Sequence, residues 1–283
     1  MGEGAPVDVA TVLCQWATGG LAYLWVTTRR REVGLGYGWL LRSLYGVIAV
    51  IAAVAGFVFQ LNAVRDFACI AMALCAGATL VRSALPNVSP AGPREPAGSI
   101  DSDGAAPAES SPRRTIEVFD SRWDLAAPLA GVVGVVAAGL GASGDINPVL
   151  HLARVVVGAA FLGAVSDSML LGHWYLVQPG LRREPLRELV RHLGGIWPVE
   201  VGLLLLPTGM MAVLTGSIDD GYGGLLGWFW AACAITTVAL ASLAMAALRE
   251  RQYAAVMAAT GLLYLAILTG FGTDLVARVT LAG

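Results

Sequence analysis

The sequence predicts an all-α integral membrane protein that crosses the bilayer about eight times. The chain has 283 residues, of which 57% are hydrophobic and 13% are charged. That charged share is about half of what a soluble globular domain carries. The hydrophobic residues are gathered in runs of about 20, the length that a helix needs to cross a ~30 Å hydrocarbon core. This composition is not that of a disordered chain, and a net charge of −2 offers no basic surface for nucleic acid.

Eight apolar runs follow one another along the chain, and these are the expected spans. The first run follows an acidic flank and precedes a second span closely, so we interpret it as a retained helix and not as a cleaved signal peptide. The four cysteines all lie inside apolar runs and lack metal-binding spacing, as is typical of buried thiols. The expected spans are residues 8–27, 39–61, 66–85, 124–143, 151–177, 190–216, 223–248 and 254–281.

The distribution of arginine predicts the orientation of these spans. All 18 basic residues are arginine, and fifteen of them lie in or beside the connections 28–42, 82–122, 178–191 and 249–251. The opposite ends of the spans hold only Arg65, Arg154 and Arg278. Because cytoplasmic loops are enriched in basic residues, we expect the first set of connections in the cytoplasm and both termini outside. The expected location is the plasma (inner) membrane of a bacterium.

Residues 86–122 differ sharply from the runs on either side. They contain six of the thirteen prolines and almost no large apolar side chain. A segment of this composition cannot bury enough surface to offset its ordering entropy. We therefore expect a flexible cytoplasmic linker between a three-helix membrane segment, 1–85, and a five-helix membrane segment, 123–283. The alternative is a docking segment built on residues 115–119.

Two carboxylates lie well inside spans that follow each other, and these are the candidate catalytic residues. A rise of ~1.5 Å per residue places Asp167 about 10 Å and Glu200 about 12 Å below the cytoplasmic surface. An ionisable group at such a depth costs at least ~2.5 kcal/mol, which makes it a functional candidate. The hairpin of the two spans predicts one shared cavity that opens toward the cytoplasm, with Asp167 and Glu200 as a proton relay. The alternative is that Asp167 is satisfied locally by Ser166, Ser168 or an arginine.

Four residues near the cytoplasmic rim of the same hairpin are candidate cofactor ligands. His173 and His192 could bind the iron of a b-type haem, or could line a quinone pocket with Trp174 and Tyr175. At the other end, Asp274 and Arg278 are four residues apart and are expected to form an ordinary helix pair. Arg154 is interpreted as an anchor at the outer rim, and no metal site is expected.

The tract from Leu170 to Pro179, LLGHWYLVQP, resembles one found in uncharacterised multi-pass bacterial membrane proteins with a GHWYL-type sequence. The resemblance covers about 20 residues and implies no known activity.

Three hypotheses about function follow from these observations. The first is a redox-linked or proton-handling membrane subunit, with haem b or quinone as the possible cofactor. The second is a secondary transporter for a cation or small solute, although the halves of the chain show no repeat of the kind that many transporters contain. The third is a non-catalytic accessory or assembly subunit. The expected partners are the lipid bilayer and other membrane subunits, and the isolated chain has no motif of a hydrolase or nucleotide-driven enzyme.

Overall fold

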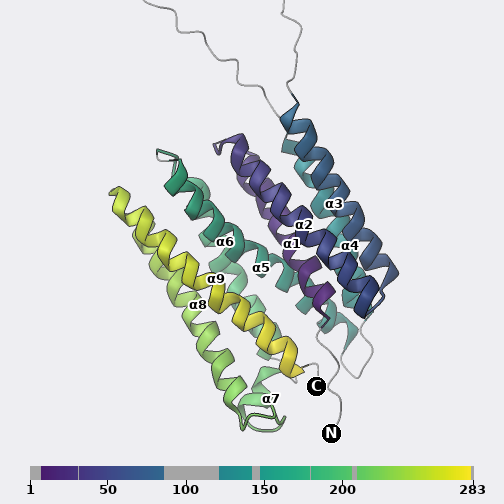
Figure 1. The fold of residues 1–283 in the computed structure, drawn as a ribbon. Helices are drawn as coiled ribbons and strands as arrows, with labels where there is room; N and C mark the ends of the chain where they lie inside the picture. The colour runs from purple at the N-terminus through teal and green to yellow at the C-terminus, as the bar shows by residue number, and fades with distance from the viewer. Residues whose placement is uncertain are drawn as a thin grey trace, which may run out of the picture.

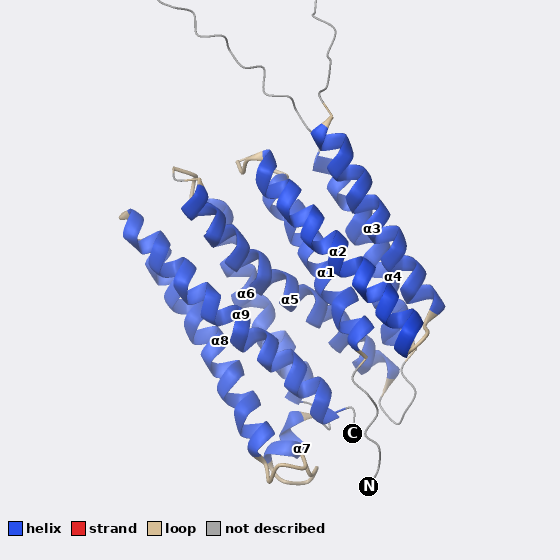
Figure 2. Ribbon diagram, in the orientation of Figure 1, coloured by secondary structure: helices blue, strands red, loops and turns tan. Residues whose placement is uncertain are grey.

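The computed structural model describes residues 8–30, 32–85, 121–141, 147–178, 180–205 and 209–281. Every element in these ranges is a helix (Figure 2). The elements are α1 (Val9–Thr28), α2 (Leu35–Phe59), α3 (Ala63–Ala84), the short 3-10 helix η1 (Ser121–Leu125), α4 (Ala126–Leu140), α5 (Pro148–Val177), α6 (Glu184–Leu205), α7 (Met210–Leu214), α8 (Leu225–Arg249) and α9 (Tyr253–Leu281).

Seven helices in the described part of the chain are long and apolar enough to cross a membrane, counting η1 and α4 together as one. The prediction of an all-α, multi-pass membrane protein is therefore confirmed. Their bounds lie within a few residues of the expected spans. The exception is the expected span 190–216, which the structure divides into α6 and α7. By length and composition α6 does not qualify as a span, although it packs against α5 and α8.

The predicted linker falls almost wholly outside the described residues. Only its last two residues, Ser121 and Arg122, are described, and they begin η1. From there α4 returns to the first three helices and packs against both α1 and α3. The predicted three-helix and five-helix segments are thus in contact through the helix that follows the linker.

Side chains at three helix starts explain where those helices begin. The Asp8 carboxylate accepts a hydrogen bond from the Thr11 backbone N–H at 3.1 Å at the start of α1. The Asn62 side chain does the same for Arg65 of α3 at 3.2 Å. Asn147 caps α5, and Pro148 follows it at the first helical position. Each cap satisfies a backbone donor that has no partner inside the helix.

The centre of the bundle is the contact between α1 and α5. A Cβ added to Gly19 would lie 1.8 Å from the carbonyl oxygen of Ala159, and one added to Gly163 would lie 2.3 Å from the carbonyl carbon of Gly19. The two backbones therefore touch, which only small residues permit and which is common where lipid provides no hydrophobic drive for helix association. Around this pair, α2 and α4 contact α1, and α6 and α9 contact α5.

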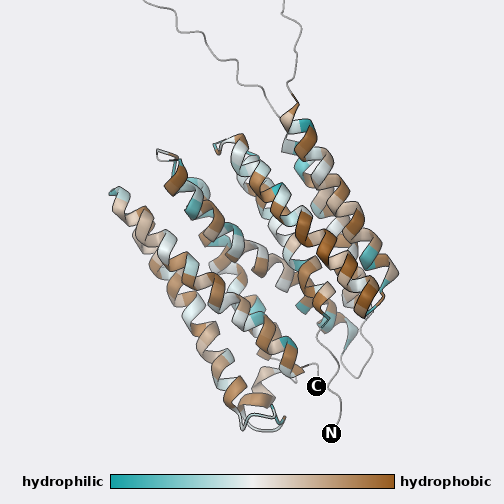
Figure 3. Cartoon of the chain, viewed as in Figure 1, coloured by the Kyte–Doolittle hydropathy of each residue, from teal (hydrophilic) through white to brown (hydrophobic). Residues whose placement is uncertain are grey.

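Hydrophobic residues, drawn in brown, recur along the helices in Figure 3, and many large ones are exposed on the bundle. In α2, the exposed face carries Val47, Val50, Ile51 and Val54, each at least half exposed. A soluble protein would place polar side chains there. The exposed apolar face and the buried charges described below together fit a bundle surrounded by lipid.

The start of α1 and the end of α9 lie at the same end of the bundle (Figure 1). The connections α1–α2, α5–α6 and α8–α9 and the end of α3 lie at the opposite end. These are the connections in which the sequence concentrates arginine.

Candidate functional site: two polar layers inside the bundle

Asp167 lies in the middle of α5 and is completely buried. One carboxylate oxygen accepts a hydrogen bond from the hydroxyl of Tyr45 on α2. The second oxygen, Oδ2, has no hydrogen-bond partner among the described residues. Tyr45 can reach this position because Gly20 of α1 leaves room for its ring, where a Cβ would come within 2.1 Å.

Three tyrosines from two other helices surround this carboxylate. Tyr37 and Tyr45 of α2 are fully buried, and Tyr23 of α1 also interacts electrostatically with Asp167. The Tyr37 hydroxyl has no hydrogen-bond partner that meets ordinary geometry among the described residues, and the Thr27 side chain lies close to it. We call Tyr23, Tyr37, Tyr45 and Asp167 the tyrosine layer.

Two further polar groups adjoin the tyrosine layer. The Ser168 hydroxyl is buried and has no partner among the described residues. The His192 ring of α6 packs on Tyr23 with the ring centroids 5.8 Å apart, and its buried Nδ1 atom is also without a partner in the described chain. Ser166, by contrast, accepts a hydrogen bond from the Trp16 indole at 2.8 Å. The tyrosine layer and the His192 ring that packs on it therefore contain unpaired polar atoms from α2, α5 and α6.

Glu200 is also almost completely buried, at 1% exposure, but it has different neighbours. It interacts electrostatically with Arg154 of α5 and with Asp274 and Arg278 of α9. Neither of its carboxylate oxygens has a hydrogen-bond partner in the described chain. The Arg154 Nε atom donates to the carbonyl of Leu203, in the last turn of α6, at 2.8 Å.

Side chains from α1 and α9 come together next to Gly158 of α5. A Cβ added there would lie 3.0 Å from Arg278 Nη2, 3.1 Å from Gln15 Nε2 and 3.2 Å from Asp274 Oδ1. The side chains of α1 and α9 thus approach α5 over a residue that has no side chain of its own. We call Gln15, Arg154, Glu200, Asp274 and Arg278 the charge layer.

The prediction that Asp167 and Glu200 share one cavity is wrong. Two contacts give the register of α5 and α6, which run antiparallel: Arg154 reaches the carbonyl of Leu203, and Tyr175 reaches that of Arg182. Both contacts place Glu200 beside a position about ten residues before Asp167 on α5, or about 15 Å along the helix axis. Helix α6 begins at Glu184, six residues before the expected span, so more of the helix lies between the hairpin connection and Glu200, and Glu200 lies farther from that connection than the sequence suggested.

The two histidines do not face each other either. His173 is exposed, and its Nδ1 atom pairs with the Tyr264 hydroxyl of α9 at 2.9 Å. His192 faces Tyr23 of α1. In the same register they are about eight residues, or about 12 Å, apart along the bundle. The structure therefore places the two rings against different partners and does not bring them together.

Trp174 and Tyr175, the other candidates for a cofactor pocket, contact the protein itself. The Trp174 indole donates to the Gln178 side chain at 3.1 Å, and its ring lies 5.9 Å from that of Tyr37. The buried Tyr175 donates its hydroxyl to the carbonyl of Arg182 and so ties α5 to the connection that follows. No group of three or more His, Cys, Asp or Glu side chains in the described ranges is arranged to hold a metal ion.

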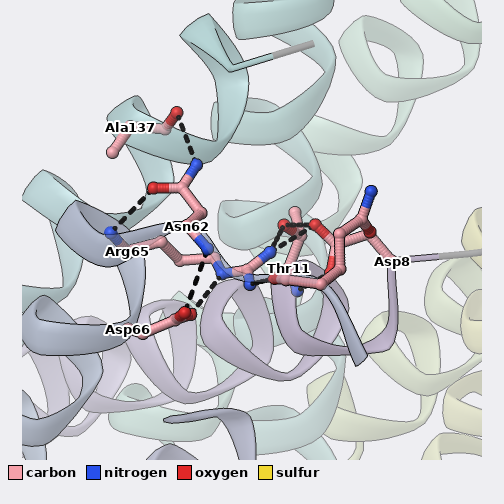
Figure 4. Close-up of polar contacts among 7 residues, drawn as sticks. Asp8, Thr11, Asn62, Arg65, Asp66 and Ala137 are labelled. Atoms are coloured by element: carbon pink, nitrogen blue, oxygen red, sulfur yellow. Dashed lines mark hydrogen bonds and ion pairs between the residues drawn. The ribbon is translucent and has the colours of Figure 1, made fainter. Parts of the chain in front are cut away.

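Two other buried arginines are, unlike Asp167, directly paired with carboxylates. Figure 4 shows Arg65 between Asp8 and Asp66; it donates to Asp66 at 2.8 Å, to Thr11 at 3.1 Å and to the carbonyl of Gln60 at 2.6 Å, and it also binds Asp8. Arg42 binds Asp124 of η1 through two hydrogen bonds of 2.8 and 2.9 Å. These ion pairs join helices and leave no group unsatisfied.

Sequence reasoning found both buried acids but missed the residues around them. Asp274 and Arg278 form the expected helix pair, four residues apart, but Asp274 is fully buried, which was not expected. Arg154 lies near the start of α5 and is buried too. One signal was present for the tyrosines: Tyr37 and Tyr45 are eight residues apart on a helix, which places them on one face.

Comparison with known proteins adds no family to this description. No family model, no curated protein and no solved structure matches the chain.

Proposed function

We propose that this chain is a proton-handling membrane protein in which Asp167 is the proton-binding group. The observation that carries the proposal is a fully buried carboxylate with one oxygen bound to Tyr45 and the other without a partner. An ionised carboxylate in an apolar interior is costly unless it is paired with a cation. A proton on Asp167 removes that cost, so proton binding is the chemistry that this position supports best.

The tyrosine layer supplies groups that can carry a proton to and from Asp167. A tyrosine hydroxyl is both a donor and an acceptor, and Tyr45 already donates to Asp167. His192, at nearly the same level and in contact with Tyr23, has two ring nitrogens, one of which can donate and the other accept a hydrogen bond. These groups lead from Asp167 toward the arginine-rich end of the bundle.

A purely structural role for Asp167 is less well supported than for the other buried charges. Arg65 and Arg42 are each held by carboxylates in direct ion pairs. Asp167 forms no ion pair within the described ranges, and its strongest partner is a neutral hydroxyl. A non-catalytic assembly subunit would need only buried charges in ion pairs, like those of Arg65 and Arg42.

The membrane setting belongs to the same proposal. We infer that α6 and α7 together form an eighth crossing, that the arginine-rich end faces the cytoplasm, and that both termini are outside. The membrane is then the plasma membrane of a bacterium. On this arrangement the tyrosine layer lies nearer the cytoplasm and the charge layer nearer the outside.

Proton flux in vesicles tests the function. The purified protein is placed in lipid vesicles with an internal pH-sensitive dye, and a membrane potential is imposed. We expect faster proton entry than in empty vesicles, complete loss of that difference in Asp167→Asn, and partial loss in Tyr45→Phe. Tyr264→Phe is the matched control, because Tyr264 contacts His173 outside the tyrosine layer.

Folding of each variant is checked by size-exclusion chromatography and thermal unfolding in detergent. The proposal fails if wild-type vesicles conduct no faster than empty ones, or if folded Asp167→Asn conducts as well as wild type. It also fails if Asp167→Asn loses folded protein, because the carboxylate is then structural.

A further inference from the structure

The charge layer contains buried acceptor atoms that lack donors. Glu200 has two carboxylate oxygens without a hydrogen-bond partner in the described chain, and Gln15 has one amide oxygen in the same state. Both side chains are at most 1% exposed. All three orphaned atoms are oxygens, so the ligand that satisfies them must bring a donor or a positive charge.

The charges that face Glu200 limit what that ligand can be. They are Arg154 from α5 and Asp274 and Arg278 from α9. Gln15 of α1 is neutral, and α7 and α8 contain no charged residue at this level. With Glu200 ionised, the two acids and the two guanidinium groups balance.

A metal cation would have to bind beside two guanidinium groups, which repel it. A proton forms a covalent bond to one carboxylate oxygen and needs no further ligands. It also supplies the donor that the orphaned oxygens lack. The geometry therefore favours a proton over a metal ion at Glu200.

Arg154 connects this carboxylate to the interruption between α6 and α7. It donates to the carbonyl of Leu203, before the interruption. After the interruption, a Cβ added to Gly209 would lie 2.9 Å from Arg154 Nη2 and 1.9 Å from the carbonyl oxygen of Leu204. Arg154 thus contacts both sides, while Arg278 is held by Asp274 at 2.7 and 2.9 Å.

We propose that Glu200 is a second proton-binding site, separate from Asp167, and that a proton bound there loosens the hold of Arg154 on the end of α6 and on α7. An ionised Glu200 attracts Arg154 and keeps it beside Leu203. A neutral Glu200 leaves the layer with one excess positive charge and removes that attraction.

This site functions independently of the tyrosine layer. The two acids are about 15 Å apart along the helix axis, and between them Gly19 of α1 touches Ala159 and Gly163 of α5 backbone to backbone. A proton does not cross such a contact without a hydrogen-bonded chain. The inference therefore stands or falls separately from the role of Asp167.

Infrared spectroscopy of wild-type protein with ¹³C-labelled glutamate carboxyl groups tests the proton site directly. We expect a carboxylic-acid band that shifts on glutamate labelling and disappears as the pH is raised. Exposed glutamates are ionised near neutral pH, and loss of the band in Glu200→Gln but not in Glu188→Gln assigns it to Glu200 and not to the other buried glutamate. The band should be absent in Glu200→Gln and retained in Asp167→Asn.

Hydrogen–deuterium exchange tests the coupling to Arg154. In Glu200→Gln, which imitates the neutral state, we expect the amides of α7 and the last turn of α6 to exchange about tenfold faster at every pH, which corresponds to about 1.4 kcal/mol. In wild type the same acceleration should follow the loss of charge on Glu200 as the pH falls. Glu188→Gln is the matched control on the same helix, because Glu188 pairs with Arg29 at the opposite end.

Two results would overturn the inference. If no glutamate band appears at any pH at which the wild-type protein is folded, Glu200 is not a proton site. If the band appears but exchange in α7 does not follow it, the coupling through Arg154 is wrong. Both measurements can be made on wild-type protein, so they remain decisive if Glu200→Gln does not fold.

Discussion

At the scale of single residues, buried charges in this protein are treated in two different ways. Arg65 and Arg42 lie in complete ion pairs, whereas Asp167 and Glu200 keep carboxylate oxygens without partners. Removing one member of a complete pair leaves an isolated charge and is strongly destabilising. Asp167 has no cation partner in the described chain, so its neutralisation leaves no isolated charge behind. Asp167→Asn should therefore cost less stability than the loss of Arg42 or Arg65.

Arg42→Met should destabilise the protein by about 3–5 kcal/mol, because it leaves the Asp124 carboxylate buried without its cation. Both side chains are at most 2% exposed, so solvent offers little compensation. The double variant Arg42→Met with Asp124→Leu should recover most of the loss. Unfolding in detergent measures both, and a single variant as stable as wild type would contradict the argument.

Gly19→Ala should be among the most damaging changes of a single methyl group. The added Cβ would overlap the Ala159 carbonyl oxygen at 1.8 Å and force α1 away from α5, at a cost of at least 1–3 kcal/mol by the usual measure of overpacking. Gly77→Ala and Gly261→Ala are matched controls, since nothing lies within 4 Å of a Cβ at either position. Those two variants should unfold at or slightly above the wild-type temperature.

At the scale of elements, the start of α8 depends on one carboxylate in the loop before it. Asp220 accepts hydrogen bonds from the backbone amides of Tyr222 at 2.9 Å and of Gly224 and Leu226 at 2.8 Å. The Gly224 amide contributes most, and together these bonds lower the pKa of Asp220. The loop lies outside the spanning helices, so water reaches this cap.

The sign of this shift predicts a pH dependence. Because the pKa of Asp220 is lower in the folded protein than in the unfolded chain, its stabilisation is fully present above the unfolded value, about 4, and is lost as the pH falls through the folded value. Asp220→Asn should therefore lower the unfolding temperature at neutral pH. As the pH is lowered, the unfolding temperature of this variant should fall less than that of wild type. Asp219→Asn is the control, since Asp219 accepts a single bond, from Gly221. Equal effects of the two variants would contradict the cap.

At the scale of the whole molecule, sidedness makes a direct prediction. The start of α1 and the end of α9 share one end of the bundle, and the connections α1–α2, α5–α6 and α8–α9 share the other (Figure 1). A reporter fused after Gly283 should behave as periplasmic, and one inserted at Gly104 as cytoplasmic. Opposite signals would reverse the orientation of both polar layers, whereas equal signals would contradict an even number of crossings.

Charge and hydropathy in the sequence were enough to find the membrane class, the helices and the two buried acids. These features follow from local rules. An apolar run of sufficient length forms a helix in lipid, and an acid inside such a run stands out because its insertion into the membrane costs free energy. The one misplaced helix, α6, is also the least apolar, because charged residues occupy its first turns. The apolar run in this part of the sequence begins at residue 190, whereas α6 itself begins at Glu184.

Only the tertiary structure decided what each acid faces. Asp167 meets Tyr45, which lies 122 residues away in the chain, and Glu200 meets Asp274 and Arg278 of the last helix. Such partners depend on the order and register in which helices pack, and lipid-facing and core-facing residues are equally apolar here. The sequence by itself determined that charges are buried in this membrane protein, whereas packing decided that they form two separate layers, because the contact of Gly19 with Ala159 and Gly163 brings α1 and α5 together between them.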